Sequence, residues 1–198
     1  MTGRELLCAS KMGMVRLPVG GPVRAWLRLA GSDVADAARL TEWRNRFVTA
    51  FLTEFEATEE RTVRWLMGKV ASDETRILFM LDMPDGETVG YLGLAFIDWE
   101  AGRGEADAVV RGAEAPGGLM TAALRTALDW ASGPLGLKKL GVRVRSDNPA
   151  LAFYEKAGFH EIQRVSLQRV ESPGMVAWVE NPTAVDAKLS LVHMEWTG

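Results

Sequence analysis

The sequence predicts an α/β fold with a mixed sheet. Segments with strand-like alternation and segments with helical periodicity follow one another along most of the chain, which is typical of this class. Two apolar segments joined by the turn at 84–87 indicate an antiparallel hairpin. A strand, loop, helix and strand over residues 105–145 require at least one parallel pair, which a right-handed crossover would join. We therefore expect both kinds of strand pairing in one sheet.

The length and composition indicate one domain. At about 150 residues per domain, 198 residues suggest a single unit. We place it at 22–198, after a flexible lead-in at 1–21. Apolar residues make up 47% and charged residues 25% of the chain, as in ordinary globular proteins. The net charge of −3 lacks the broad positive field that draws proteins to polyphosphate backbones, so no nucleic-acid partner is expected.

The cysteine and histidine content argues against disulfides and metal. Cys8 is the single cysteine, so an internal disulfide is impossible, and two distant histidines do not make a zinc site. The N-terminus lacks the long apolar core of a signal peptide, and no apolar run approaches about 18 residues. We therefore expect a cytoplasmic protein with no metal and no membrane contact.

Three elements are predicted in the first part of the chain. Residues 22–30 alternate between polar and apolar and predict a strand. Ser32 or Asp33 can accept the free amides at the start of a helix over 34–47. A second helix is predicted over 57–70.

The middle of the chain predicts three strands and the end predicts a second αβ unit. The strands are expected at 76–83, 88–98 and 105–111. The elements predicted after them are a small-residue loop at 112–118, a helix at 119–131, a strand at 138–145, a short helix from Pro149 that ends at Gly158, and two strands at 160–170 and 188–196 joined by a loop at 171–187.

The glycine-containing loop that opens into the helix at 119–131 is the first feature with chemical meaning. Free amides and the positive end of the helix dipole suit a pyrophosphate or similar anion, and Gly117 and Gly118 have no side chain to block its approach. The alternative is a tight loop that merely precedes a packed helix.

A more specific pattern follows at 146–159, SDNPALAFYEKAGF. Asn148 is expected to cap a short helix that follows a strand, and Tyr154 lies two turns along it. This segment resembles the GNAT superfamily of acyl-CoA N-acyltransferases, in which a helix of the form N-x-x-A-x-x-x-Y-x-x-x-G-F follows the fifth strand. The LTEWRNR segment also resembles that family, and the likeness covers about 23–165. It implies a mostly antiparallel central sheet flanked by helices, with a central β-loop-α-β unit for acyl-CoA.

The resemblance implies acetyl-CoA as co-substrate and a primary amine as acceptor. Within the family the chain is most similar to sugar-nucleotide aminosugar N-acetyltransferases, so an amino-sugar nucleotide is the acceptor expected first. Protein N-termini, ribosomal proteins and antibiotic-like amines are alternatives, and a homodimer is also expected. Ala115 stands where the family has Gln or Arg, which motivates a rival of another class, a non-catalytic acyl-CoA-binding module.

The family motif Q/R-x-x-G-x-G/A falls on Ala115, Gly118 and Met120. The backbone amides of 117–121 would cradle the pyrophosphate, and Thr121 would add a hydroxyl. The cofactor-binding residues that the resemblance implies are Val109, Val110, Arg111, Gly117, Gly118, Leu119, Met120, Thr121, Asn148, Phe153 and Tyr154.

The reaction itself needs an oxyanion donor, an acid and a base. A backbone N–H near Val109 or Val110 would stabilise the oxyanion, and Tyr154 would protonate the leaving thiolate. Glu105 and Asp107 lie two apart on one strand and hence on one face, so either could accept the proton of the amine, directly or through water. Structural roles remain open for all three side chains.

Three further residues are candidates for the acceptor. Arg44 and Asn45 would bind substrate, or else tie the first helix to the sheet. Trp99, at a turn, would stack on a sugar or base, or else belong to the core. The segments 47–57 and 171–187 are expected to shape the acceptor cleft.

Overall fold

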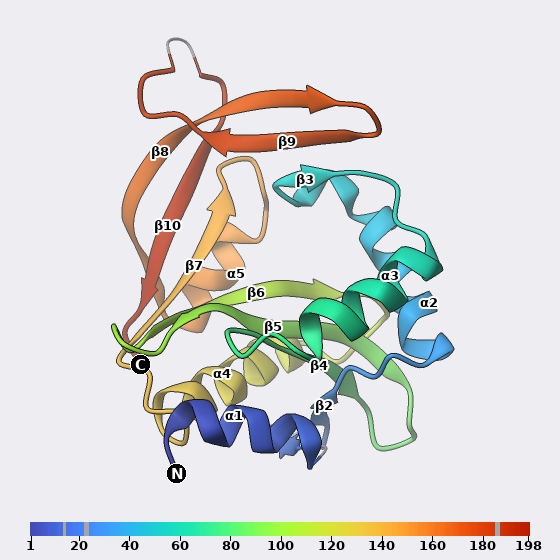
Figure 1. Ribbon diagram of the computed structural model, residues 1–198. Coiled ribbons are helices and arrows are strands. Elements are labelled where there is room, and N and C mark those ends of the chain that lie inside the picture. The colour runs from blue at the N-terminus through green and yellow to red at the C-terminus, as the bar shows by residue number, and fades with distance from the viewer. Residues whose placement is uncertain (14, 22–23, 185–186) are drawn as a thin grey trace.

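The computed structural model describes residues 1–13, 15–21, 24–184 and 187–198 (Figure 1). The strands are β1 (Arg16–Pro18), β2 (Trp26–Leu29), β3 (Thr53–Glu54), β4 (Ile77–Asp82), β5 (Thr88–Asp98), β6 (Arg103–Arg111), β7 (Lys139–Arg145), β8 (Phe159–Ser172), β9 (Met175–Glu180) and β10 (Ser190–Trp196). The helices are α1 (Gly3–Met12), α2 (Val34–Arg46), the 3₁₀ turn η1 (Val48–Ala50), α3 (Glu59–Trp65), the π-helical turn η2 (Leu66–Val70), α4 (Leu119–Ser132) and α5 (Leu151–Ala157).

The strands form one ten-stranded sheet in the order β1-β2-β4-β5-β6-β7-β10-β8-β9-β3. Strands β6 and β7 are parallel, and the other neighbours in the described sheet are antiparallel. Helix α4 connects the parallel pair. The expected α/β fold with a mostly antiparallel sheet and a central β-loop-α-β unit is confirmed.

Two segments that were expected to be irregular contain regular structure. Residues 1–21, expected to be a flexible lead-in, contain α1 and β1; Met14 lies outside the described residues. Thr2 and Glu5 exchange the two hydrogen bonds of a capping box, and Leu7 is fully buried in the core. The segment 171–187, expected to be a loop, contains β9, which pairs with β8. Its residues 185 and 186 are not among those described.

Helices cover both faces of the sheet (Figure 1). One core cluster joins α1, α4 and α5 to the sheet, and the inward face of α4 supplies the fully buried Leu124, Ala127 and Leu128. The other cluster joins α2 and the turn after α3 to the opposite face, where Trp43 stacks on Tyr91 with 6.1 Å between ring centroids. The sheet is therefore the middle of three layers in this half of the molecule.

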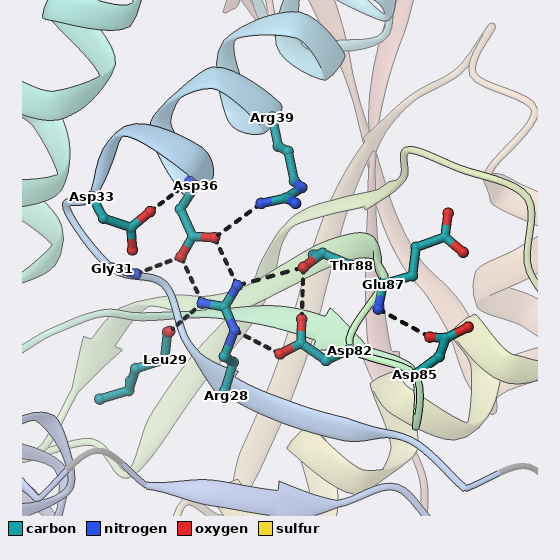
Figure 2. Close-up of polar contacts among 10 residues, drawn as sticks. All are labelled: Arg28, Leu29, Gly31, Asp33, Asp36, Arg39, Asp82, Asp85, Glu87 and Thr88. Carbon is teal, nitrogen blue, oxygen red and sulfur yellow. Dashed lines mark hydrogen bonds and ion pairs between the residues drawn. The ribbon is translucent and has the colours of Figure 1, made fainter.

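A buried ion-pair network attaches α2 to the outer strands (Figure 2). Arg28 on β2 donates to both carboxylate oxygens of Asp36 at 2.6 and 2.7 Å and to Asp82 on β4 at 2.6 Å. Asp36 also accepts the Gly31 amide. Asp33 caps the helix through the Asp36 amide, as one of the two expected caps. These bonds fix the start of α2, the helix that carries Arg44.

The parallel strands stay together for only a short distance. Strand β6 pairs with β7 from Arg103 to Glu105, and beyond that point no pairing between the two strands is found in the described residues. The part of β6 beyond this point contains a bulge. Two observations identify it: Ala108 has a positive φ of 51°, and the register of β6 against β5 shifts there. The two strands thus diverge, and their facing edges keep unpaired backbone groups.

The segment between α2 and α3 closes over this opening. Strand β3 pairs with β9, and the Trp178 amide donates to the Leu52 carbonyl at 2.8 Å. Glu54 accepts from Arg145 at 3.1 Å and from the Trp178 indole at 2.7 Å. The β3–β9 pair therefore forms a roof between the two halves of the sheet (Figure 1). None of the helices in the described ranges has the length and apolarity needed to cross a membrane.

Candidate active site

A central cavity of about 690 Å³ lies where β6 and β7 diverge. Asp107, Asn148 and Tyr154 line it. Two further cavities adjoin it because they share lining residues with it: a donor-side cavity beside α4 shares Val109, and an acceptor-side cavity beside α2 and α3 shares Asp107. The three form one continuous candidate site.

The donor-side cavity has a volume of about 280 Å³. Gly118 precedes α4 in a left-handed conformation with φ 81°, which suits glycine. A Cβ at Gly117 or Gly118 would meet no atom within 4 Å, so the loop faces open space. The lining residues are Val109, Arg111, Pro116, Gly118, Met120, Thr121, Ala150 and Phe153.

The backbone of this loop presents free donors. The Leu119 amide donates to Pro116 at 3.1 Å, and the Leu119 side chain is buried in the core. Among the residues described, the amides of Gly117, Gly118, Met120 and Thr121 have no acceptor. Free amides at a helix N-terminus fit a pyrophosphate. Leu119, expected in this set, contributes neither a free amide nor an exposed side chain.

The outer half of β6 fits the extended arm of an acyl-CoA. Its edge toward β7 has no strand partner beyond Glu105 in the described residues, so its amides and carbonyls can pair with the amides of a pantetheine chain. Val109 lines both the donor-side and central cavities, and Arg111 lies at the exposed end. The Val110 side chain is instead largely buried against α2.

Tyr154 is a buried side chain at the centre of the site. It is 7% exposed and packs edge-to-face against Phe153 and Phe159. Burial raises the pKa of its hydroxyl above the ordinary value, and the negative charge of Asp107 raises it further. The hydroxyl is therefore protonated at neutral pH and can serve as a proton donor.

The two candidate carboxylates have different surroundings. Glu105 pairs with Arg143 at 2.7 Å. Asp107 has no ion-pair partner among the described residues, and burial raises its pKa despite the nearby charges of Arg76 and Arg143. Asp107 is thus the carboxylate that remains available to accept a proton, while Glu105 is held by its arginine.

Asn148 reaches the cavity but its amide group is engaged. Its Oδ1 accepts from the Ala150 amide at 2.9 Å, and its Nδ2 donates to the Ala50 carbonyl at 3.1 Å. Ala150, rather than Asn148, is the N-cap residue of α5. Asn148 therefore stabilises the turn before the helix and ties η1 to it.

The acceptor-side cavity, with a volume of about 470 Å³, is lined by Arg44 and Asp107, which the sequence singled out, and by several aromatic and basic groups that it did not. Its walls are mainly aromatic, and two guanidinium groups and one carboxylate face it. The residues that define it are Arg44, Phe51, Phe55, Arg61, Trp65, Tyr91 and Asp107. Phe51 and Phe55 belong to the segment 47–57, which was expected to shape the acceptor cleft.

Of the three side chains expected to contact the acceptor, Arg44 alone lines this cavity. Asn45 forms two hydrogen bonds with the Ala57 backbone: its Nδ2 donates to the carbonyl at 3.0 Å, and its Oδ1 accepts from the amide at 2.8 Å. Asn45 therefore ties α2 to the segment before α3. Trp99 donates to the Glu74 carbonyl at 3.0 Å and packs against the core. The turn that carries Trp99 lies at the paired end of β6, away from the cavities. Neither Asn45 nor Trp99 lines the acceptor-side cavity, and both make the structural contacts that were the alternative expectation for them.

No group of three or more His, Cys, Asp or Glu side chains placed to hold a metal occurs in the part of the chain that the structure describes.

Comparisons with known proteins agree with this geometry. The profile of the family described as "Acetyltransferase (GNAT) domain" matches residues 24–160. No curated protein sequence matches the chain significantly. The spermidine N-acetyltransferase of Vibrio cholerae, in a crystal structure with CoA and spermine, is similar in fold with a TM-score of 0.66 at 18% identity, over 86% of this chain and 94% of that one. A chimera of that enzyme with hSSAT has a TM-score of 0.67 at 17% identity, over 87% and 94%. Because the family profile spans most of the chain, the protein belongs to the GNAT family and is an acyl-CoA-dependent N-acetyltransferase that uses acetyl-CoA.

Proposed function

We propose that the enzyme acetylates a primary amine that enters the acceptor-side cavity, with Asp107 as base and Tyr154 as acid. The observation that carries this proposal is the position of Asp107, which lines both the central and the acceptor-side cavities. An amine beside Asp107 would lie next to the place where β6 presents its free edge. The two substrates would therefore meet at this carboxylate.

Different residues bind the cofactor, deprotonate the amine and stabilise the oxyanion. The free amides before and within the first turn of α4 would hold the pyrophosphate, and the edge of β6 near Val109 would align the thioester. Asp107 takes one proton from the ammonium group, which frees the lone pair for attack on the thioester carbonyl. A backbone N–H near Val109 or Val110 stabilises the negative charge that develops on the carbonyl oxygen.

The remaining steps conserve atoms and charge. The new C–N bond forms and the C–S bond breaks. Tyr154 gives its hydroxyl proton to the departing sulfur, and the second proton of the nitrogen restores the tyrosine through water. The raised pKa of Tyr154 ensures that the proton is present at the start of each cycle.

The acceptor proposed first is an amino-sugar nucleotide, which follows from the resemblance of the sequence. The aromatic walls formed by Phe51, Phe55 and Trp65 support a ring-containing acceptor. Protein N-termini and antibiotic-like amines are alternatives, and a polyamine is a further one because two proteins of similar fold are named for spermidine. A homodimer and a cytoplasmic location also remain proposals.

Thiol release from acetyl-CoA tests the function directly. The panel contains a UDP-linked amino sugar, a peptide with a free N-terminus, an aminoglycoside and spermidine. Turnover with one class and acetylation of its amine, seen by mass spectrometry, are expected. Binding of CoA without turnover of any amine would contradict the proposal and favour the non-catalytic module.

A further inference from the structure

We propose that the acceptor carries an acidic group, a carboxylate or a phosphate, close to its amine, and that Arg44 and Arg61 bind that group. This inference rests on the proposed function, because it assigns the substrate class of the same cavity. It also predicts that polyamines are poor acceptors, although the solved structures of similar fold include enzymes named for spermidine.

Arg44 forms no ion pair with any of the residues that the structure describes. Its guanidinium lies between the rings of Phe51 and Phe55, at 3.8 and 4.6 Å from their centroids. Its Nη2 donates to the backbone and hydroxyl of Thr53, whereas its Nη1 is buried and has no acceptor in the described part of the chain. A buried donor that lacks an acceptor costs about 1–3 kcal/mol, and more when it is charged. Because Arg44 lines the acceptor-side cavity, an anionic group bound there would supply an ion-pair partner for its guanidinium.

Glu54, whose charge acts on Arg44, forms its ion pair with a different arginine. Glu54 follows Thr53 in β3, and its carboxylate accepts from Arg145 and from the Trp178 indole in the roof. No ion pair joins Glu54 or any other described carboxylate to Arg44. Burial lowers the pKa of Arg44, and the negative charge of Glu54 offsets this lowering only in part.

Arg61 adds a second positive charge to the same wall. Its guanidinium lies 4.7 Å from the centroid of Phe55, so that ring contacts both arginines. Arg61 donates to the Glu56 carbonyl at 3.3 Å, and no carboxylate among the described residues pairs with it. By contrast, Arg64 one turn later in α3 pairs with Glu60 at the surface and does not line the cavity.

The charges of the cavity favour an acceptor with one ammonium and one anion. Two guanidinium groups and one carboxylate line it. Asp107 suits the amine, and Arg44 and Arg61 suit an anion, because guanidinium groups bind carboxylates and phosphates in a two-pronged geometry. A polyamine would instead bring a second cation toward the arginines, which repel it.

Matched amines test the inference and separate the two anion sources. Tyrosine against tyramine measures the contribution of a carboxylate, and glucosamine 6-phosphate against glucosamine measures that of a phosphate. We expect kcat/KM to be about tenfold or more higher for the acidic member of at least one pair, since hydrogen bonds to charged groups are worth about 1.5–3 kcal/mol. Spermidine should be poorer than either acidic amine. Equal values within both pairs, or a preference for spermidine, would overturn the inference.

Variants of the two arginines test whether these side chains cause the preference for acidic amines. Arg44→Met and Arg61→Gln should each lower kcat/KM for the amine that carries the acidic group by about tenfold or more, mainly through KM. The same variants should change kcat/KM for the matched amine that lacks this group by less than about threefold. Arg64→Gln is the matched control and should leave both unchanged. Arg61 is more exposed than Arg44, so Arg61→Gln should disturb folding less. Arg61→Gln therefore still tests the inference if Arg44→Met does not fold. Equal losses for both members of a pair would contradict the inference but leave the acetyltransferase activity intact. No turnover of any amine, with CoA still bound, would instead contradict the proposed function.

Discussion

Asp107 on β6 and Tyr154 on α5 line the same cavity, and the charge of Asp107 reaches the tyrosine hydroxyl. Burial raises the pKa of both groups. For the tyrosine this keeps a proton in place, and for the aspartate it raises the affinity for a proton. The tyrosine therefore enters the reaction with its proton, and the aspartate binds an incoming proton more tightly than an ordinary carboxylate does.

Replacing Tyr154 by Phe removes the proposed acid and keeps the ring. We expect Tyr154→Phe to lower kcat by about 100-fold or more, because general acid catalysis contributes on that order. The dissociation constant of CoA, measured by calorimetry, should change little, since the ring contacts with Phe153 and Phe159 remain. An unchanged kcat would remove Tyr154 from this role.

Replacing Asp107 by Asn removes the proposed base. Only the ionised carboxylate accepts a proton, and its pKa is raised, so activity of the native enzyme should fall as the pH drops through that raised value. We expect Asp107→Asn to lower kcat by about 100-fold. The remaining activity should no longer fall as the pH drops through the raised pKa of the aspartate. Asp98→Asn, at the end of β5, is the control. A native-like profile in Asp107→Asn would show that another group is the base.

The same substitution should increase stability at neutral pH. The native Asp107 binds its proton more tightly than the unfolded chain, whose aspartate pKa is about 3.9. The native enzyme therefore loses stability as the pH rises from that value through the raised pKa. Urea unfolding should show Asp107→Asn to be more stable at pH 7, with the difference shrinking toward pH 4. Asp98 should behave oppositely, because the Ala101 amide lowers its pKa.

Two adjacent glycines give a test of the donor-side loop. Gly118 has φ 81° and Gly117 is not left-handed, and neither would place a Cβ against another atom. Gly118→Ala should therefore cost about 1 kcal/mol of stability through backbone strain and weaken CoA binding, while Gly117→Ala costs less. Thermal unfolding and CoA titration measure both effects. Equal effects of the two substitutions on stability would rule out strain as their cause.

The roof depends on Arg145, whose side chain is 8% exposed. It donates to Glu54 and Asp147 and lies 5.1 Å from the centroid of the Trp178 ring. Arg145→Met should cost about 3 kcal/mol in urea unfolding, because it leaves partly buried carboxylates unpaired. Arg169→Met, in the exposed β8–β9 hairpin, should stay within about 0.5 kcal/mol. A loss no greater than that of the control would contradict the structural role of Arg145.

Local patterns in the sequence predicted most of the fold. The apolar segments on either side of the turn at 84–87 and the spacing from Asn148 to Tyr154 are set by neighbours along the chain, and the corresponding elements formed. Helix α1 was missed although its signal was present, since Thr2 and Glu5 have the spacing of a capping box. Likewise, Pro173 and Gly174 mark the turn before β9.

The acceptor-side cavity could not be predicted in the same way. Arg44, Phe55, Arg61 and Tyr91 come from four separate segments and meet only after the sheet and its helices have packed. The position of Trp99 relative to the cavities could not be predicted for a related reason. A place in a turn does not reveal at which end of β6 the strands diverge. Whether Asp107 or Glu105 is free likewise depends on Arg143, which lies on another strand.

The roof has a consequence for the order of events in a catalytic cycle. Phe51, Leu52 and Thr53 line the central cavity, while the donor-side and acceptor-side cavities have no lining residue in common. Each substrate therefore has its own route, and neither has to leave before the other arrives. Initial-rate plots at varied concentrations of both substrates should intersect rather than run parallel, and each product should depart independently of the other.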